Sequence, residues 1–466
     1  MKVTELIQFG SKVIELFDAY VESNKIKPPT RPYVRHFYTE LKISERGTSS
    51  ASSSEIIEKP FWARIVHDFM KSKIIPMPEF IELFQSIAKK YKRNIHILAP
   101  TSNVEDQASW WLQMFSQRLI YEKLGGSFSQ DSLVELASLF KSELELAPTE
   151  YKYVVYLHGL FLEVDSLTLN DNVLVRRVQK ADLEYEGDIA FDIPSSRYIH
   201  PSALPSSIME ITMYAKDQRE GFDYIDRISN ALRIYRLGSI YSKEIMSTSR
   251  TAIWLSGVTR SSERATSRPP LWKYTLKEPE LDSFISFVNT IEQRLTQVKE
   301  EKERRILDIS ISRYNSALLD PVDIDIRLMN AVMGLESLFT FEKDRGENAY
   351  KLGIRVAILL GYFDFAVEEV RQLVEQAYNH RNKVVHGSLF TEKDKERMHE
   401  ITPKILNYLR VSLAIFTLES QKISKDKLIE DIDKSAISDR EGKKLGDMLT
   451  ADLQGFKESI CELTDH

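Results

Sequence analysis

Four consecutive segments, at residues 324–341, 350–360, 366–385 and 402–418, repeat apolar residues at three- and four-residue spacing, and this pattern constrains the fold most strongly. Such spacing places the apolar side chains on one face of a helix. Short connections between helices of this kind favour antiparallel packing. We therefore predict an antiparallel helical bundle, with Pro403 in the first turn of its last helix.

The chain before the bundle changes character between its two halves. Helical periodicity recurs at 6–21, 80–88, 110–124 and 132–146, which predicts a helical N-terminal domain. Residues 46–54 are mostly serine and other small residues, from which we predict a flexible loop. Aromatic and β-branched residues then dominate, and they predict strands together with one helix at 222–237. The predicted strands are 151–157, 160–162, 173–175, 207–213 and 251–255.

The predicted fold class is therefore α+β, mostly α. We divide the chain into a helical N-terminal domain (1–147), a mixed β-rich domain (148–278), the helical bundle (279–423) and a charged C-terminal tail (424–466). The charged run at 290–305 fits a solvated helix face or a spacer helix.

Composition excludes several functional classes. The 466 residues include 63 Lys+Arg and 69 Asp+Glu, a net charge of -6 that excludes coating of nucleic acid by bulk charge but leaves room for a local basic cleft. Cys461 is the single cysteine, which excludes a disulfide framework and a cysteine-based zinc cluster and fits a reducing compartment. We found no stretch long and apolar enough to span a bilayer, and Glu15 and Asp18 interrupt any signal peptide, so we expect a cytoplasmic protein with no membrane association.

Common catalytic and ligand-binding motifs are also missing from the sequence. There is no phosphate-binding loop, no dinucleotide-binding glycine motif, no nucleophile elbow and no paired-histidine zinc motif. The nine histidines are scattered, so we expect no metal site and no cofactor. Arg227, Arg233, Tyr235 and Arg236 on the 222–237 helix fit either a nucleic-acid face or, as we favour, an amphipathic helix with solvated arginines.

The third bundle helix carries an arginine at an unexpected position. Arg381 lies on the same predicted stripe as Val370, Val374 and Ala377. Because a buried charge is costly unless it is paired, this guanidinium needs a partner. The partner is either an internal carboxylate such as Glu336, which would be a structural arrangement, or an anion at an interface, which would be a functional one.

The spacing between Arg381 and His386 limits how the two could act together. They are five residues apart, which is about 7.5 Å along a helix axis and roughly 140° around it. Either Gly387 ends the helix and His386 turns back in an irregular last turn, or two copies meet across a twofold axis and line one cleft with both residue types. The dipole at the helix C-terminus favours a protonated His386, which suits a general acid.

An arginine and a histidine can supply most of what metal-free RNA cleavage requires. The 2′-hydroxyl must lose its proton, the leaving 5′-oxygen must gain one, and a cation must stabilise the charge on phosphorus. The bare spacing occurs often by chance, and a structural helix end with a capping histidine is the alternative.

Residues from about 304 to 416 resemble the HEPN superfamily, specifically its Apea-like branch. The resemblance rests on residues 313–318, 330–338, 351–357 and 381–387, in this order and in helical context. The β-rich part before them is similar in style to domains that precede such modules, with weaker matches at 157–160 and 174–177.

The resemblance implies a homodimer formed through the helices that carry the 381–387 box. It also implies a metal-independent endoribonuclease that leaves a 2′,3′-cyclic phosphate and a 5′-hydroxyl, often in bacterial antiviral defence against phage or as a toxin. By the same resemblance, Arg381 and His386 are the catalytic pair, Asn382 is the polar residue that follows the arginine, and Glu336 orients Arg381 or contributes to the site. Tyr378 is interpreted as packing.

Three hypotheses follow from the sequence. The leading one is a cytoplasmic HEPN ribonuclease whose upstream domains sense a phage-derived or regulatory trigger or restrain the nuclease, and whose acidic net charge favours structured RNA such as tRNA. The second is a non-catalytic HEPN module that binds RNA, nucleotide or a protein partner through the same groove. The third is a structural scaffold.

Overall fold

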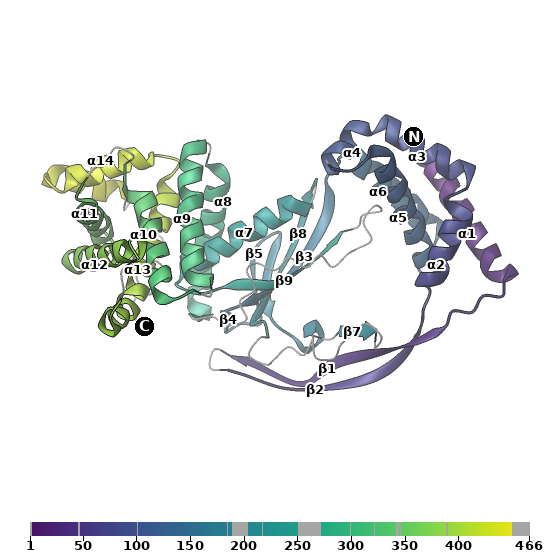
Figure 1. The fold of residues 1–466 in the computed structure, drawn as a ribbon, viewed down its shortest axis with the longest axis horizontal. Coiled ribbons are helices and arrows are strands. Elements are labelled where there is room, and N and C mark those ends of the chain that lie inside the picture. The colour runs from purple at the N-terminus through teal and green to yellow at the C-terminus, as the bar shows by residue number, and fades with distance from the viewer. Residues whose placement is uncertain are drawn as a thin grey trace.

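The computed structural model describes residues 2–449 apart from 45–46, 100, 184, 189–203, 217, 250–271, 299, 321, 342–343, 345 and 388–389. These residues form a mixed α+β fold in which N-terminal helices, a central antiparallel sheet and C-terminal helices follow one another along the chain (Figure 1). The predicted fold class is confirmed. None of the helices in these ranges combines the length and the apolar composition that crossing a membrane requires.

The N-terminal helices enclose a hydrophobic core of their own. Large buried side chains from different helices meet there, among them Phe17, Phe69, Trp111 and Phe140. The helices predicted at 6–21, 80–88, 110–124 and 132–146 are confirmed. The elements are α1 (Val3–Ser23), α2 (Ala63–Phe69), the π-helical turn η1 (Met70–Ile74), α3 (Pro78–Lys90), α4 (Lys92–Leu98), α5 (Val104–Leu124) and α6 (Gln130–Leu144).

A long two-stranded ribbon interrupts these helices between α1 and α2 (Figure 1). Strand β1 (Thr30–Ser44) pairs antiparallel with β2 (Gly47–Pro60) in a register that runs from Thr30↔Pro60 to Ser44↔Gly47. The prediction of a flexible loop at 46–54 was therefore wrong for residues 47–54, which belong to β2. Small side chains bury little surface, but the strand is held by main-chain hydrogen bonds to β1, which do not depend on the side chains.

Strand β1 also pairs with a segment of the central region, β7 (Tyr185–Asp188). The sheet order β2-β1-β7 therefore links the N-terminal part of the chain to a segment that lies between β6 and β8 of the central region. The ribbon consequently makes a second connection between the two regions, besides the short link from α6 to β3.

The central region is an antiparallel sheet in the order β5-β6-β8-β3-β9. Helix α7 (Gln218–Tyr235) packs against it, and Gly221 permits this close approach, because a Cβ there would lie 2.0 Å from the Tyr153 hydroxyl oxygen. The predicted helix and four of the predicted strands are confirmed, whereas 251–255 lies outside the described residues. The strands are β3 (Thr149–His158), β5 (Ser166–Asn170), β6 (Val173–Arg177), β8 (Ser207–Ala215) and β9 (Tyr241–Ser249), with β4 (Leu160–Leu162) and β10 (Tyr274–Leu276) paired in parallel beside them and the short helix η2 (Lys180–Leu183) after β6.

The C-terminal region is helical, as the periodicity predicts. The prediction that Pro403 lies in a first turn was wrong, because the helix begins at Glu392, where the Thr391 side chain accepts the Asp394 N–H in a capping box. Pro403 is an interior residue that tertiary packing tolerates despite a cost of about 3 kcal/mol. The helices are η4 (Glu278–Glu280), α8 (Leu281–Gln297), α9 (Glu301–Leu319), α10 (Ile324–Phe339), α11 (Asn348–Gly361), α12 (Val367–Val385), α13 (Glu392–Glu419), α14 (Lys425–Ser435) and a last one at 439–449.

The central sheet and the C-terminal helices share one hydrophobic core. The C-terminal end of α7 lies inside this core, where bundle side chains satisfy its carbonyl groups. The Tyr314 hydroxyl donates to the Arg233 carbonyl oxygen at 2.9 Å, and the buried Arg410 donates to the carbonyl oxygens of Ile234 and Tyr235 at 2.9 and 2.7 Å. Residues 148–278 and the bundle are thus joined by buried polar contacts as well as by apolar packing.

Candidate functional site

Helix α12 positions the residues predicted to form the site. Val370, Val374 and Ala377 are buried, and Arg381 continues their stripe at the point where the helix approaches the surface. Facing this last turn is α10, which carries Glu336. The apolar periodicity of α12 therefore places Arg381 on the buried side of the helix, and the crossing of α10 brings Glu336 opposite it.

Arg381 is paired with an internal carboxylate. Its Nη2 lies 3.2 Å from Glu336 Oε2, and the two side chains are 23% and 21% exposed. Its Nη1 donates to Asn382 Oδ1 at 3.1 Å, and its Cζ lies 5.6 Å from the centroid of the Tyr378 ring. Of the two partners considered from the sequence, the structure contains the carboxylate, and it brings Arg381, Asn382 and Glu336 together.

The hydrogen-bonding capacity of this guanidinium is not fully used. The Arg381 Nε atom is buried, yet its N–H has no acceptor among the residues that the structure describes. Buried donors without a partner are rare, and they are expensive to maintain. This N–H is out of contact with solvent, so a group from outside the protomer can reach only the exposed part of the guanidinium.

Two opposing influences act on the Glu336 carboxyl. Burial raises its pKa, while the positive charge of Arg381 and the hydroxyl of Tyr378 lower it, and burial prevails. Glu336 therefore holds its proton more tightly than an exposed glutamate. Tyr378, interpreted from the sequence as packing, thus also acts on the carboxylate that holds Arg381.

His386 lies just beyond the end of α12. Its backbone N–H donates to the Asn382 carbonyl oxygen at 3.0 Å, and the next residue, Gly387, adopts the left-handed φ of +67° that closes the helix. The predicted helix end at Gly387 is confirmed. The imidazole is exposed, and in the described part of the chain no hydrogen bond connects it with Arg381. Within one protomer the structure therefore does not bring the two residues together.

A second histidine in this turn was missed by the sequence analysis. His380 precedes Arg381, and its ring lies 6.4 Å from that of Phe390, which comes just before α13. Burial lowers its pKa, and the nearby charges of Lys383 and Arg397 lower it further. The sequence offered one signal for His380, which is its position directly before Arg381.

The three arginines singled out on the predicted 222–237 helix do not form a nucleic-acid face. Arg227 Nε donates to Glu292 Oε1 at 2.9 Å, and Arg236 Nη2 donates to Glu280 Oε2 at 2.5 Å. Arg233 is only 2% exposed and donates to the Ile240 carbonyl oxygen. The favoured interpretation, an amphipathic helix, is correct, but these arginines bind protein groups and are not merely solvated.

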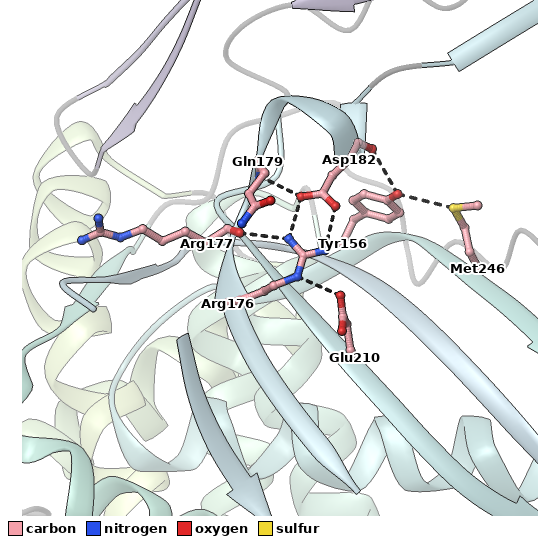
Figure 2. Close-up of polar contacts among 7 residues, drawn as sticks. All are labelled: Tyr156, Arg176, Arg177, Gln179, Asp182, Glu210 and Met246. Atoms are coloured by element: carbon pink, nitrogen blue, oxygen red, sulfur yellow. Dashed lines mark hydrogen bonds and ion pairs between the residues drawn. The ribbon is translucent and has the colours of Figure 1, made fainter. Parts of the chain in front are cut away.

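A polar cluster on the central sheet is satisfied internally as well (Figure 2). Arg176 makes two hydrogen bonds of 2.7 Å to the carboxylate of Asp182 and one of 2.8 Å to Glu210. These carboxylates raise the pKa of Arg176, and Asp182 also accepts the Gln179 backbone N–H at 2.7 Å. The cluster joins η2 to strands β6 and β8, which is a structural role.

Neither a metal-binding cluster nor a known relative identifies the site. Within the described ranges, no group of three or more His, Cys, Asp or Glu side chains is arranged to hold a metal ion. Comparison of the chain with models of known protein families, with curated proteins and with solved structures gave no match.

Proposed function

We propose that this chain is a metal-independent endoribonuclease of the HEPN type, which acts as a homodimer through Arg381 and His386. The observation that carries the proposal is the Arg381 guanidinium, which Glu336 holds at the last turn of α12 with 23% of the side chain exposed. A phosphate oxygen is a suitable acceptor for this group. An exposed imidazole at the end of the same helix provides acid–base chemistry nearby.

The proposed reaction is a transesterification. The ribose 2′-oxygen forms a bond to phosphorus while the bond from phosphorus to the 5′-oxygen breaks. One imidazole takes the 2′-hydroxyl proton, and a second, protonated imidazole gives a proton to the departing 5′-oxygen. Arg381 stabilises the negative charge that develops on the phosphoryl oxygens. The products are a 2′,3′-cyclic phosphate and a 5′-hydroxyl.

Two copies of the chain supply the two imidazoles. Arg381 and His386 do not contact each other within a protomer, so a twofold arrangement would place Arg381 opposite the partner's His386. The side chain of Val385, beside His386, is 56% exposed, which suits an apolar contact in such an interface. Glu336 is a positioning residue, since it contacts the arginine rather than the RNA.

The biological setting that fits this chemistry is bacterial antiviral defence or toxin action, with RNA, for instance tRNA, as the substrate. The regions before the bundle would sense a trigger or restrain the nuclease. Their polar contacts to the bundle, through Tyr314 and Arg410, provide a physical route for such control.

The test is RNA cleavage in the presence of EDTA. Wild type should cut and leave 2′,3′-cyclic phosphate ends, whereas Arg381→Ala and His386→Ala should lose at least about 100-fold in rate. Arg371→Ala is the matched control, because Arg371 lies on the same helix and pairs only with Glu368 and Glu375 of that helix in the described structure. Light scattering on each variant separates loss of the dimer from loss of chemistry.

Binding without cleavage is the second candidate, and the separation of Arg381 from His386 within the protomer favours it. In that case RNA, nucleotide or a protein partner would bind saturably, Arg381→Ala would weaken the binding, and products would never form. If expression of wild type stops growth and the purified protein still does not cut RNA, the result supports this candidate. Relief of the growth arrest by His386→Ala would decide for the nuclease.

A further inference from the structure

A cavity of about 630 Å³ lies between α7, α8 and α9, away from the Arg381 site. Its size is typical of sites for small organic ligands, and its position, where the central region meets the C-terminal helices, is a common location for them. The residues that line it come from three helices and from Tyr241 at the start of β9. The proposed nuclease chemistry uses none of them.

The floor of the cavity is a fixed polar network. Arg233 Nη1 donates to the side-chain oxygens of Asn230 and Asn315 at 3.1 and 3.3 Å, and Asn315 Nδ2 donates to Asn230 Oδ1 at 2.9 Å. Asn230 Oδ1 thus accepts one bond from Arg233 and one from Asn315. The amide N–H groups of Asn230 have no acceptor in the part of the chain that the structure describes. They are therefore free to donate to a ligand.

One side of the cavity is apolar. Leu295 of α8 and Ile311 and Leu319 of α9 line it, and the latter two are buried. This wall can hold the carbon skeleton of a ligand, while the network below it fixes the ligand's orientation by hydrogen bonds.

The rim presents charges of both signs on one helix. Arg304 and Asp308 lie one turn apart on α9, where Cβ atoms are about 5–6 Å apart. No ion pair within 4 Å joins them in the described structure, and Asp308 has no hydrogen-bond partner there. Arg304 makes only a long contact, 3.4 Å from Nη2 to the Val298 carbonyl oxygen. Burial raises the pKa of Asp308 and the charge of Arg304 lowers it, so the two groups act on each other without a direct ion pair, and each keeps hydrogen-bonding capacity for a ligand.

The combination of charges decides between ligand classes. A simple anion would face the rim carboxylates Asp223, Asp226 and Asp308, and a simple cation would face Arg304. A chelated metal ion is disfavoured, because the carboxylates do not form a metal-binding group. Arg227, the other arginine near the rim, is already paired with Glu292. A ligand that carries both charges at short distance satisfies both signs.

We infer that this cavity binds a small zwitterion with the chemistry of an α-amino acid, either free or at the ends of a short peptide. Its ammonium group faces Asp308, its carboxylate faces Arg304 and the Asn230 amide, and its side chain packs on Leu295 and Ile311. This binding is independent of the proposed nuclease activity.

The experiment uses the full chain and the twenty free amino acids, followed by dipeptides of those that bind. At least one should raise the melting temperature saturably, and calorimetry should then give a Kd that weakens at least tenfold in both Asp308→Asn and Arg304→Gln. Analogues of this ligand that lack either the ammonium or the carboxylate should bind at least tenfold more weakly. Binding of the free amino acid and of its dipeptide, compared side by side, distinguishes the two sources.

Matched variants remove the same charges elsewhere. Asp171→Asn, in the turn between β5 and β6, and Arg64→Gln, at an 87% exposed side chain of α2, should leave the Kd unchanged. The inference is overturned if no amino acid or dipeptide stabilises the protein saturably, or if Asp308→Asn and Arg304→Gln bind like wild type. The melting temperature without ligand verifies that each variant is folded.

Discussion

Arg355 of α11 and Asp433 of α14 form a two-pronged ion pair between residues 78 positions apart in the chain. Arg355 Nε and Nη2 donate to the two carboxylate oxygens at 2.8 and 2.9 Å. The same guanidinium, only 4% exposed, also donates to Asp344 at 2.6 Å and to the Phe339 carbonyl oxygen at 2.9 Å. One buried side chain thus fastens α14 to the end of α10, the helix that carries Glu336.

Arg355→Gln should lower the free energy of unfolding by about 3 kcal/mol, because it removes the buried guanidinium that pairs with both Asp433 and Asp344 and leaves Asp344 with Lys351 at 3.9 Å. Asp433→Asn should cost less, about 1 to 2 kcal/mol, since the Asp433 side chain is 44% exposed and Asp344 still pairs with Arg355. Urea denaturation measures both effects. Glu430→Gln, which removes an exposed pair with Lys434 on the same helix, should change stability by less than about 0.5 kcal/mol. Equal effects of all three variants would contradict this assignment.

Gly387→Ala should strain the end of α12. The residue has a φ of +67°, and a Cβ there would meet nothing within 4 Å, so the cost of about 1 kcal/mol comes from the backbone alone. Gly126→Ala is the matched control, with a φ of +75° and equally open surroundings after α5. Both should destabilise similarly in thermal unfolding, but only Gly387→Ala should reduce RNA cleavage, because it displaces His386.

Glu336 should make stability depend on pH in one defined window. Burial raises its pKa above 4.5 in the folded state, so its favourable contribution is complete below that value and is lost as the pH rises through the raised pKa. Over this window wild type should lose stability relative to Glu336→Gln by at most about 1.4 kcal/mol per pH unit. Arg381→Ala removes the charge that lowers this pKa, so it should extend the window to higher pH. Urea unfolding at several pH values tests this, and parallel curves for wild type and Glu336→Gln would refute it.

His380 should titrate below the usual histidine range. Burial is the main cause, Lys383 and Arg397 add repulsion, and Asp394 opposes them. An NMR titration should place its midpoint below 6.5, and Lys383→Gln should move the midpoint upward. Since the folded pKa is lowered, protonation favours unfolding, and stability should fall as the pH drops through 6.5 toward the folded value. A midpoint at or above 6.5 would show that the ring is not buried in solution.

The helices were the most predictable part of this structure, and the reason is physical. A helix satisfies its hydrogen bonds locally, so its buried stripe appears in the sequence at fixed spacing, as Val370, Val374 and Ala377 illustrate. Both strands of the ribbon were missed: β1 was not predicted as a strand, and the serines of β2 leave no such pattern. Pro403 was misplaced because the capping box at Thr391, twelve residues and about three helical turns earlier, was not recognised.

The candidate site was only partly predictable. The stripe containing Arg381 implied a partner, and Glu336 was named as one, but the direction of the guanidinium depends on how α10 crosses α12. The pairing of Arg355 with Asp433 was out of reach, because a contact between residues 78 positions apart has no local signal. The cavity beside α7 depends in the same way on helices from separate parts of the chain.

The ribbon of β1 and β2 has a mechanical consequence. It leaves the N-terminal helices, reaches β7 and returns, so any rotation of those helices against the central sheet must bend the ribbon or break its pairing with β7. A movement of the N-terminal helices would therefore reach the β7 segment through the main chain of the ribbon. This transmission depends little on the side chains that the ribbon carries. Proline cannot donate a main-chain hydrogen bond, and β1 already carries Pro32 opposite Glu58, so a proline would uncouple the two ends only where it replaces a residue whose N–H donates to β7.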